Sequence, residues 1–254
     1  MTTGTPRTVE AVQKACTIID ALQEQRAAGI TELADTVAYS KSTVHGHLAT
    51  LVDEGLVVKD GHEYRLSHRF LDIAESVKNR VTDYEIVREQ MREIADETGE
   101  LVHFGTEENG RVVYIAKCRG DQAVQTESRI GKQMPMHSTS LGKAILAEYS
   151  RERVDRIVDQ HGLAPRTPNT NTTLDSLHDD LEETTRRGCS IDDEENIPGI
   201  RCLGIAMSVS EAGVIAALSI SGPSERMTDD RIETELHPTI AQAANVIEVN
   251  SMYS

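Results

Sequence analysis

Residues 30–51, ITELADTVAYSKSTVHGHLATL, hold two short helical patterns separated by a break. The first pattern begins at Thr31, and the second is capped by Ser40 or Ser42, whose hydroxyls can accept a hydrogen bond from a helix start. The second pattern has one apolar face at helical spacing, formed by Val44, Leu48 and Leu51. Two short amphipathic helices about a tight turn are typical of a helix-turn-helix.

The other face of the second helix carries small polar and cationic side chains. They are Lys41, Ser42, Thr43, His45, His47 and Thr50. Small side chains let a helix backbone approach the DNA major groove, and hydroxyls and imidazoles can reach phosphates and base edges. The alternative is two surface helices of an ordinary helical domain. The pattern therefore favours DNA binding without establishing it.

The flanking sequence has the parts that a winged helix-turn-helix needs. An amphipathic pattern over 8–28 predicts a supporting first helix. Strand patterns at 56–59 and 63–66 surround Asp60-Gly61, a strong hairpin signal, and predict a wing. Its basic side chains suited to phosphates are Lys59, His62 and Arg65. A further helix after Ser67 would connect to a second domain and pack on the first helix or on a partner chain.

The rest of the chain alternates helices with antiparallel hairpins. Helices are expected at 84–98, 140–149, 151–160, 174–187 and from Thr228 onward, where Pro238 should bend or break the last one. Strands are expected at 101–104, 111–116, near 123–128, at 189–192, and at 202–209 and 214–221 across a turn at 211–213. This mixture predicts an α+β fold with an antiparallel sheet.

Composition places the chain among two-domain intracellular proteins. It has 254 residues, no Trp and two Phe, so aliphatic side chains must fill its cores. No apolar run approaches the ~20 residues of a membrane span, and the first residues lack the apolar core of a signal peptide. The four cysteines have no paired spacing and are typical of reduced thiols. We expect a cytoplasmic protein without a membrane segment.

The charge is strongly acidic and unevenly distributed. The chain has 42 acidic and 26 basic residues, a net charge of −16. Residues 1–80 carry a net charge of −2 and residues 81–254 a net charge of −14. Abundant carboxylates with only seven lysines suggest the high-salt cytoplasm of a halophile, although an acidic mesophilic protein is the alternative. High salt would weaken the contribution of counterion release to DNA binding.

Catalytic motifs are absent from the sequence. There is no GxSxG elbow, Walker loop or HExxH, and we expect no cofactor and no metal. The acidic run 192–195 could chelate a cation, but a solvated turn is the more ordinary interpretation. A metal held by His137 and Cys202 would rest on two scattered residues.

The loop 134–143 is a candidate ligand site. Ser138, Thr139 and Ser140 lie where a helix begins, and hydroxyls, free N–H groups and the helix dipole together favour an anion. Small residues on the two late strands would leave room opposite this loop: Cys202, Gly204, Ala206, Ser219 and Ser221. The site suits a small carboxylate. A serine-capped helix packed over small residues explains the pattern equally well.

Taken together, the motifs resemble those of the IclR family of transcription regulators over nearly the whole chain. The motifs are TVEAV at 8–12, KSTVH at 41–45, YRL at 64–66, VYI at 113–115, MHSTSLGKA at 136–144, DDEE at 192–195, PGIRC at 198–202 and AALSISGP at 216–223. The resemblance implies a winged helix-turn-helix (1–67), a linker helix (68–82) and a GAF-like effector-binding domain (83–254). It also implies a homodimer or homotetramer on pseudo-palindromic double-stranded DNA, controlled by a small metabolite such as a carboxylic or sugar acid.

The residues of the helix-turn-helix and wing predict the DNA contacts, and the resemblance assigns the effector contacts. The positions expected to contact DNA are Tyr39, Ser40, Lys41, Ser42, Thr43, His45, His47, Lys59 and Arg65. The positions expected to contact the effector are Ser138, Thr139, Ser140, Leu141, Asp192, Cys202, Ser219 and Ser221.

The chain departs from the family pattern at the helix-turn-helix. The family often has Gly-Leu-Pro where this chain has Ala38, Tyr39 and Ser40, which predicts a turn that depends less on glycine. Gly46 stands where the family often has Arg, so His45 and His47 would compensate for a lost contact.

We expect a ligand-responsive, DNA-binding transcription regulator. The alternatives are a metabolite-converting enzyme fused to a DNA-binding domain and a DNA-binding protein without a ligand.

Overall fold

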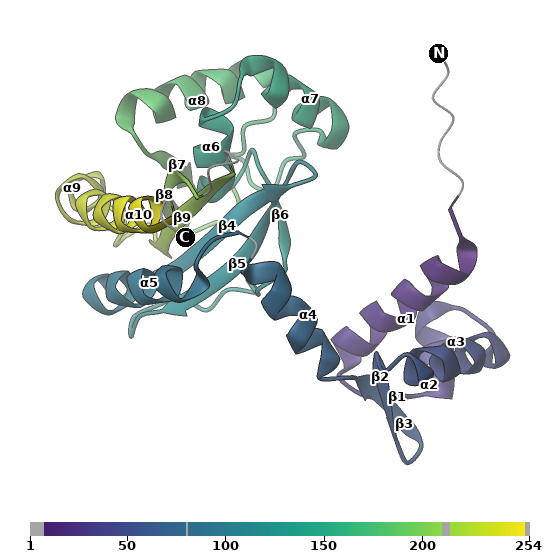
Figure 1. The fold of residues 1–254 in the computed structure, drawn as a ribbon. Coiled ribbons are helices and arrows are strands. Elements are labelled where there is room, and N and C mark those ends of the chain that lie inside the picture. Colours follow the sequence, from purple (N-terminus) through teal and green to yellow (C-terminus); the bar gives the residue numbers. More distant parts are fainter. Residues whose placement is uncertain (1–7, 80, 210–213, 252–254) are drawn as a thin grey trace. The chain divides into compact units, whose positions relative to one another are not determined.

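The structure is a computed structural model that describes residues 8–79, 81–209 and 214–251. The chain divides into two compact units, Met1–Val77 and Lys78–Ser254, so the division falls inside the expected linker helix. The first unit is a helix-turn-helix with a small sheet, and the second is a helix-covered antiparallel sheet (Figure 1). The α+β prediction is confirmed. Among the described residues, no helix is long and apolar enough to cross a membrane.

The first unit contains the predicted helices and hairpin. Its elements are α1 (Glu10–Gln25), β1 (Ala28–Gly29), α2 (Ile30–Val37), α3 (Lys41–Asp53), β2 (Val57–Asp60), β3 (Glu63–Leu66) and α4 (Arg69–Lys78). The hairpin β2–β3 turns at Gly61, whose φ of 58° is the left-handed conformation that glycine adopts freely. The two-residue strand β1 was not expected; it pairs with β3 and completes a three-stranded sheet.

The core of this unit lies between α1, α2 and α3. Ile18, Leu33, Val44 and Leu48 are fully buried there. Burying each such side chain stabilises the fold by roughly 1.5–3 kcal/mol. The predicted apolar face of α3 is therefore confirmed as the face that holds the unit together.

The helix α4 begins where the Arg69 guanidinium donates a hydrogen bond to the carbonyl oxygen of Glu54. Within the single chain it buries none of its described side chains, and Leu71 and Val77 are exposed. Its expected apolar face is thus covered only in part, since Phe70 is half-buried.

The second unit is built on a six-stranded sheet with the order β6-β5-β4-β9-β8-β7, in which every pairing is antiparallel. The strands are β4 (Leu101–Glu108), β5 (Arg111–Arg119), β6 (Gln133–Pro135), β7 (Ser190–Asp193), β8 (Ile200–Ser208) and β9 (Ile215–Pro223). The helices are α5 (Tyr84–Thr98), α6 (Ser140–Ala147), α7 (Arg151–His161), α8 (Leu174–Arg187), α9 (Asp229–Arg231), the π-helical turn η1 (Ile232–Leu236) and α10 (His237–Ser251).

The two faces of this sheet have different roles. Because side chains alternate along a strand, Leu218 and Ile220 of β9 join the apolar core under α5 and α10. Ser219 and Ser221 point to the opposite face, which α6 covers with α7 and α8 beyond it (Figure 1). Polar side chains therefore gather beneath α6.

The second unit differs from the sequence-based expectations at two points, and a third expectation lies outside the described residues. The strand expected near 123–128 is wrong: the segment is irregular, and β6 is the strand that pairs with the outer edge of β5. Pro238 does not break the last helix, because the π-helical turn η1 precedes it and α10 continues through it. The turn expected at 211–213 lies outside the described residues.

Candidate functional site

The start of α3 is ordered by a cluster of hydroxyl groups. Ser40, not Ser42, is the cap: its Oγ accepts a hydrogen bond from the N–H of Thr43 at 3.1 Å. The same Oγ lies 2.9 Å from the hydroxyl of Ser42 and 2.8 Å from that of Thr43. These contacts hold Ser42 and Thr43 in place at the first turn, where a recognition helix meets DNA.

The predicted contact residues on α3 lie away from its buried face. Lys41, Ser42 and His45 are exposed, and Thr43 and His47 are partly exposed. Gly46 lies on the same surface, and apart from its chain neighbours and the backbone of its own helix no described atom is within 4 Å of the position that a Cβ would take there. Packing therefore does not require glycine at 46, and the helix presents a bare backbone at that point.

The turn before α3 corrects one expectation. Ala38 has φ 54° and ψ 34°, the left-handed conformation, so the turn does demand what glycine supplies freely. Tyr39 packs partly against the core, and the Nζ of Lys14 lies 5.6 Å from its ring centroid. The Tyr39 ring is thus engaged within the unit, and its predicted contact with DNA stays a prediction.

The wing presents its two predicted cations on different faces. Lys59 is the cross-strand partner of the buried Tyr64, and its Nζ lies 5.7 Å from that ring centroid. Arg65 is the partner of Val58 and therefore points to the opposite face of the hairpin. The two side chains extend to separate sides of the wing.

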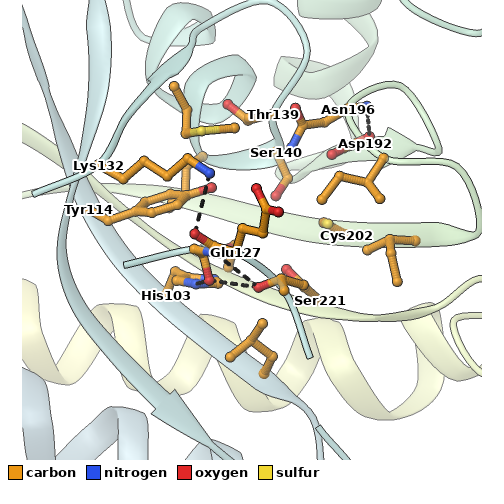
Figure 2. Close-up of a pocket in the computed structure, with 18 of the residues that line it drawn as sticks. His103, Tyr114, Glu127, Lys132, Thr139, Ser140, Asp192, Asn196, Cys202 and Ser221 are labelled. Carbon is orange, nitrogen blue, oxygen red and sulfur yellow. Dashed lines mark hydrogen bonds between the residues drawn. The ribbon is translucent and has the colours of Figure 1, made fainter. Parts of the chain in front are cut away.

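A cavity of about 470 Å³ lies in the second unit on the α6 side of the sheet (Figure 2). Seven of the eight predicted effector residues line it: Thr139, Ser140, Leu141, Asp192, Cys202, Ser219 and Ser221. Ser138 is not part of the wall; its hydroxyl is fully buried and has no hydrogen-bond partner among the described residues. The structure thus brings together residues more than 80 positions apart.

The register of the sheet explains how these residues meet. Leu101 on β4 lies opposite Ser221 on β9, Ser221 lies opposite Cys202 on β8, and Cys202 lies opposite Asp192 on β7. All four line the cavity. One row of side chains across four strands therefore forms its floor.

The N-terminus of α6 forms the roof. Thr139 is its cap: the hydroxyl donates to the carbonyl of Pro135 at 2.8 Å and accepts from the N–H of Gly142 at 3.2 Å. The Ser190 hydroxyl donates to the Ser140 carbonyl at 2.6 Å. A Cβ on Gly204 would lie 2.7 Å from that carbonyl oxygen. Gly204 thus makes room for α6 and not, as expected, for a ligand.

Burial controls the protonation of the cavity floor. Burial, reinforced by the charge of Glu195, raises the pKa of Asp192 to about 7. Burial also raises the pKa of the Cys202 thiol well above its usual range, so this thiol is protonated. His103 stacks on the ring of Tyr114 at 4.6 Å, and burial followed by the charge of Lys117 lowers its pKa to about 3, so it is neutral.

The sequence did not single out the charged groups at the rim. Lys132 and Arg166 line the cavity; the Lys132 ammonium donates to the Glu127 carbonyl at 3.3 Å and the Arg166 guanidinium to the Asn196 carbonyl at 3.4 Å. Both lie in loops, and a basic residue in a loop is by itself a weak signal. Glu127 directs its side chain into the cavity (Figure 2).

Residues 125–128, which were expected in a strand, form a flap over the cavity. Side chains from the sheet hold it: the Nε2 of His103 lies 2.8 Å from the Ser128 hydroxyl, and the Lys117 ammonium donates to the Ser128 carbonyl at 2.7 Å. Side-chain tethers from β4 and β5 replace the backbone pairing that a strand would have made.

The acidic run 192–195 is not simply a solvated turn. Asp192 is 2% exposed and Glu195 6% exposed. His137 does not join Cys202; its Nε2 lies 3.2 Å from the Ala164 carbonyl. Within the described ranges, no group of three or more His, Cys, Asp or Glu side chains could hold a metal ion.

Comparison with known proteins identifies both units. Residues 11–61 match the IclR helix-turn-helix domain, and residues 79–249 match the bacterial transcriptional regulator IclR C-terminal domain. The chain is 30% identical to a probable HTH-type transcriptional regulator ArcR of Halobacterium salinarum over 97% of its own length and 95% of that protein.

Solved structures agree with the fold. The crystal structure of the Thermotoga maritima IclR superposes with a TM-score of 0.82 at 28% identity and covers 95% of this chain and 98% of that one. An IclR homolog of Microbacterium hydrocarbonoxydans, complexed with 4-hydroxybenzoate, superposes with a TM-score of 0.79 at 20% identity, covering 94% and 100%. The chain belongs to the IclR family of transcriptional regulators.

Proposed function

We propose that this regulator binds a small carboxylate in the 470 Å³ cavity and that occupancy of the cavity controls its affinity for an operator. One observation carries the proposal: Lys132 and the N-terminus of α6 meet at one cavity (Figure 2), and Arg166 also lines it. The first N–H groups of a helix have no partner within it, and together with the two cations they outweigh the Glu127 carboxylate in the same cavity and favour an anion. The hydroxyls of Ser219 and Ser221 and the amide of Asn196 supply further hydrogen bonds.

The size and polarity of the cavity support a small polar ligand. Its volume lies at the lower end of the range for small-molecule sites. The structural neighbour from Microbacterium hydrocarbonoxydans is complexed with 4-hydroxybenzoate, a small carboxylate. A hydroxylated acid, such as a sugar acid, would use the many hydroxyl groups of the wall.

The cavity is better suited to binding than to turnover. Cys202 is the thiol that the described residues bring to the wall, and its raised pKa keeps it protonated and weakly nucleophilic. His103 is neutral, stacked on Tyr114 and hydrogen-bonded to the flap. These contacts support a sensor that does not convert its ligand.

On the DNA side, the outer face of α3 would enter the major groove and the wing would flank it, through the nine residues predicted above. A homodimer or homotetramer would place two such helices on a pseudo-palindromic operator in the cytoplasm. The ligand must bind one spacing of the two helices more tightly than the other, because equal affinity for both would shift nothing.

Replacing Ser219 with Phe tests the proposal, because the added ring would fill the cavity floor. Purified protein would be heated with lactate, gluconate or 4-hydroxybenzoate, and its binding to operator DNA recovered from a genomic pull-down would be followed by fluorescence anisotropy. We expect at least one acid to raise the Tm and change the DNA affinity of the unaltered chain. Ser219→Phe should lose both responses and keep ligand-free DNA binding.

The matched control is Thr185→Phe, which places the same bulk on an exposed position of α8. It should respond to the acids like the unaltered chain. A Ser219→Phe protein that still responds, or an unaltered chain that none of the acids stabilises, contradicts the proposed site.

A further inference from the structure

Lys143, on the α6 helix that roofs the cavity, is a buried cation outside the cavity wall. Its side chain is 1% exposed, and its Nζ lies 2.5 Å from Oδ2 of Asp180 on α8 and 2.5 Å from Oε1 of Glu195 after β7. Burial opposes this charge, but the two carboxylates outweigh it and raise the pKa of Lys143. Because apolar residues often replace a buried ion pair at no cost in stability, stability alone does not explain this cluster.

The two carboxylates that bind Lys143 differ in what they connect to. Asp180 is 23% exposed on its side chain, accepts a hydrogen bond from Asn171 at 2.9 Å and does not line the cavity. Glu195 belongs to the acidic loop, and its own N–H donates to Oδ1 of Asp192 at 2.8 Å. Of the two carboxylates, Glu195 is the one whose own residue bonds to Asp192; among the described residues Asp180 reaches it only through Asn171, whose amide also donates to Oε2 of Glu195 at 3.5 Å.

The acidic loop is held from its other side as well. The hydroxyls of Thr170 and Thr167 donate to the Glu195 carbonyl at 2.7 and 3.2 Å. The N–H of Asn196 donates to Oδ1 of Asp192 at 3.2 Å, and Asn196 itself lines the cavity (Figure 2). Among the residues that the structure describes, the Glu195 side chain is therefore what bonds this loop to the helix that roofs the cavity.

We propose that Lys143 is a positioning residue of the effector site: its ion pair with Glu195 fixes the acidic loop so that Asp192 and Asn196 form the cavity wall. This inference rests on the proposed function of that cavity. The ammonium of Lys143 lies between Asp180 and Glu195 and so balances the charge of the acidic run, for which the sequence left a bound cation as the less ordinary interpretation. The cluster serves the ligand site next to it.

The charged groups around Asp192 set its pKa, so the titration of Asp192 reports on the contact between Lys143 and Glu195. The titratable groups that act on it from neighbouring elements are Glu195, Lys143, Cys202 and Tyr114. Burial raises the pKa of Cys202 and of Tyr114, so both are neutral near pH 7. After burial itself, the charge of Glu195 raises the pKa of Asp192 and that of Lys143 lowers it. Removing the charge of Glu195 should therefore lower the pKa of Asp192, and removing the charge of Lys143 should raise it.

The experiment titrates the ligand-free full chain, labelled with ¹³C at the aspartate carboxyl carbons, by NMR. Asp192→Asn identifies the Asp192 resonance by its loss. We expect a midpoint about one pH unit lower in Glu195→Gln and about one unit higher in Lys143→Met, the size expected for a charge at this range. Asp180→Asn is the matched control, because it alters the other carboxylate on the same Nζ and should leave the midpoint in place.

Binding of 4-hydroxybenzoate at several pH values then connects the loop to the ligand. Ionised Asp192 repels an anion, so affinity should fall as pH rises through its pKa. That fall should occur at lower pH in Glu195→Gln and be unchanged in Asp180→Asn. Should Lys143→Met not fold, the comparison of Glu195→Gln with Asp180→Asn decides the matter.

An unmoved midpoint in Glu195→Gln, or an equal shift in Asp180→Asn, overturns the positioning role. The proposed function fails in a different way. If the midpoints move as expected but lactate, gluconate and 4-hydroxybenzoate all fail to bind, Lys143 positions Asp192 and the cavity is not a carboxylate site.

Discussion

Ala38 shows how one residue sets the geometry of the helix-turn-helix. Its φ of 54° lies in the left-handed region, where a Cβ crowds the backbone. The sequence pattern lacks the glycine that the family often has here, and this absence suggested a turn with no such demand. In the structure Ala38 nevertheless adopts the left-handed conformation, and the resulting strain lowers the stability of the first unit.

Replacing Ala38 with glycine should therefore stabilise the first unit by about 1 kcal/mol, because the strain of the left-handed conformation is removed. Thermal unfolding followed by circular dichroism measures the change. Ala49→Gly is the control: Ala49 is exposed inside α3, where glycine should destabilise the helix by about 1 kcal/mol. The idea fails if both substitutions lower the Tm.

At the scale of elements, α3 has one face for the core and one for a partner. Val44 and Leu48 are fully buried, whereas Thr43 is partly exposed and His45 is exposed, so neither fills the core. Replacing both Thr43 and His45 with alanine should reduce operator affinity at least about thirtyfold and leave the Tm within a few degrees, since each good base contact contributes about 1–3 kcal/mol.

Gel shifts with operator DNA measure the loss, and Thr17→Ala, at a half-buried position of α1, serves as the control. Unchanged gel shifts in the double variant would remove α3 from the groove. A collapse of the Tm would instead show that the two side chains are needed for folding.

The flap shows why one element was predicted wrongly. The segment near 123–128 has a strand-like composition, but β6 pairs with β5 in its place. The flap is then held by Lys117 on β5, the strand that precedes it, and by His103 on β4, which lies 25 positions before Ser128. A local pattern shows that a segment favours a strand but does not show which segment will pair with the outer strand of a sheet.

On the scale of the whole molecule, charge is divided between the two parts of the chain. Residues 1–80 carry a net charge of −2 and residues 81–254 a net charge of −14. Repulsion among carboxylates opposes the compact state, and salt screens it.

Raising KCl from about 0.1 M to about 2 M should therefore raise the Tm of the effector unit more than that of the DNA-binding unit. At 0.1 M the Debye length is about 10 Å and at 1 M about 3 Å, so most repulsion disappears over this range. Calorimetry of the full chain, with two resolved transitions, checks the difference. Equal shifts of the two transitions would assign the effect to general salting-out.

The sequence by itself determined the order of the helices and most strands, the buried face of α3, the hairpin at Gly61, the α+β class and the family. These depend on local periodicity, on turn residues and on ordered motifs, all of which are visible along the chain. It also named seven residues that prove to line one cavity, through the family motifs.

Only the tertiary structure decided what surrounds them. The row from Leu101 to Asp192 depends on the register of four strands, and Lys132 and Arg166 reach the rim from loops without a pattern of their own. Lys143 looked like one residue of a motif, yet it is buried between two carboxylates 37 and 52 positions away. Strand register, loop conformation and ion pairing depend on contacts with distant parts of the chain, so they cannot be predicted from the local sequence.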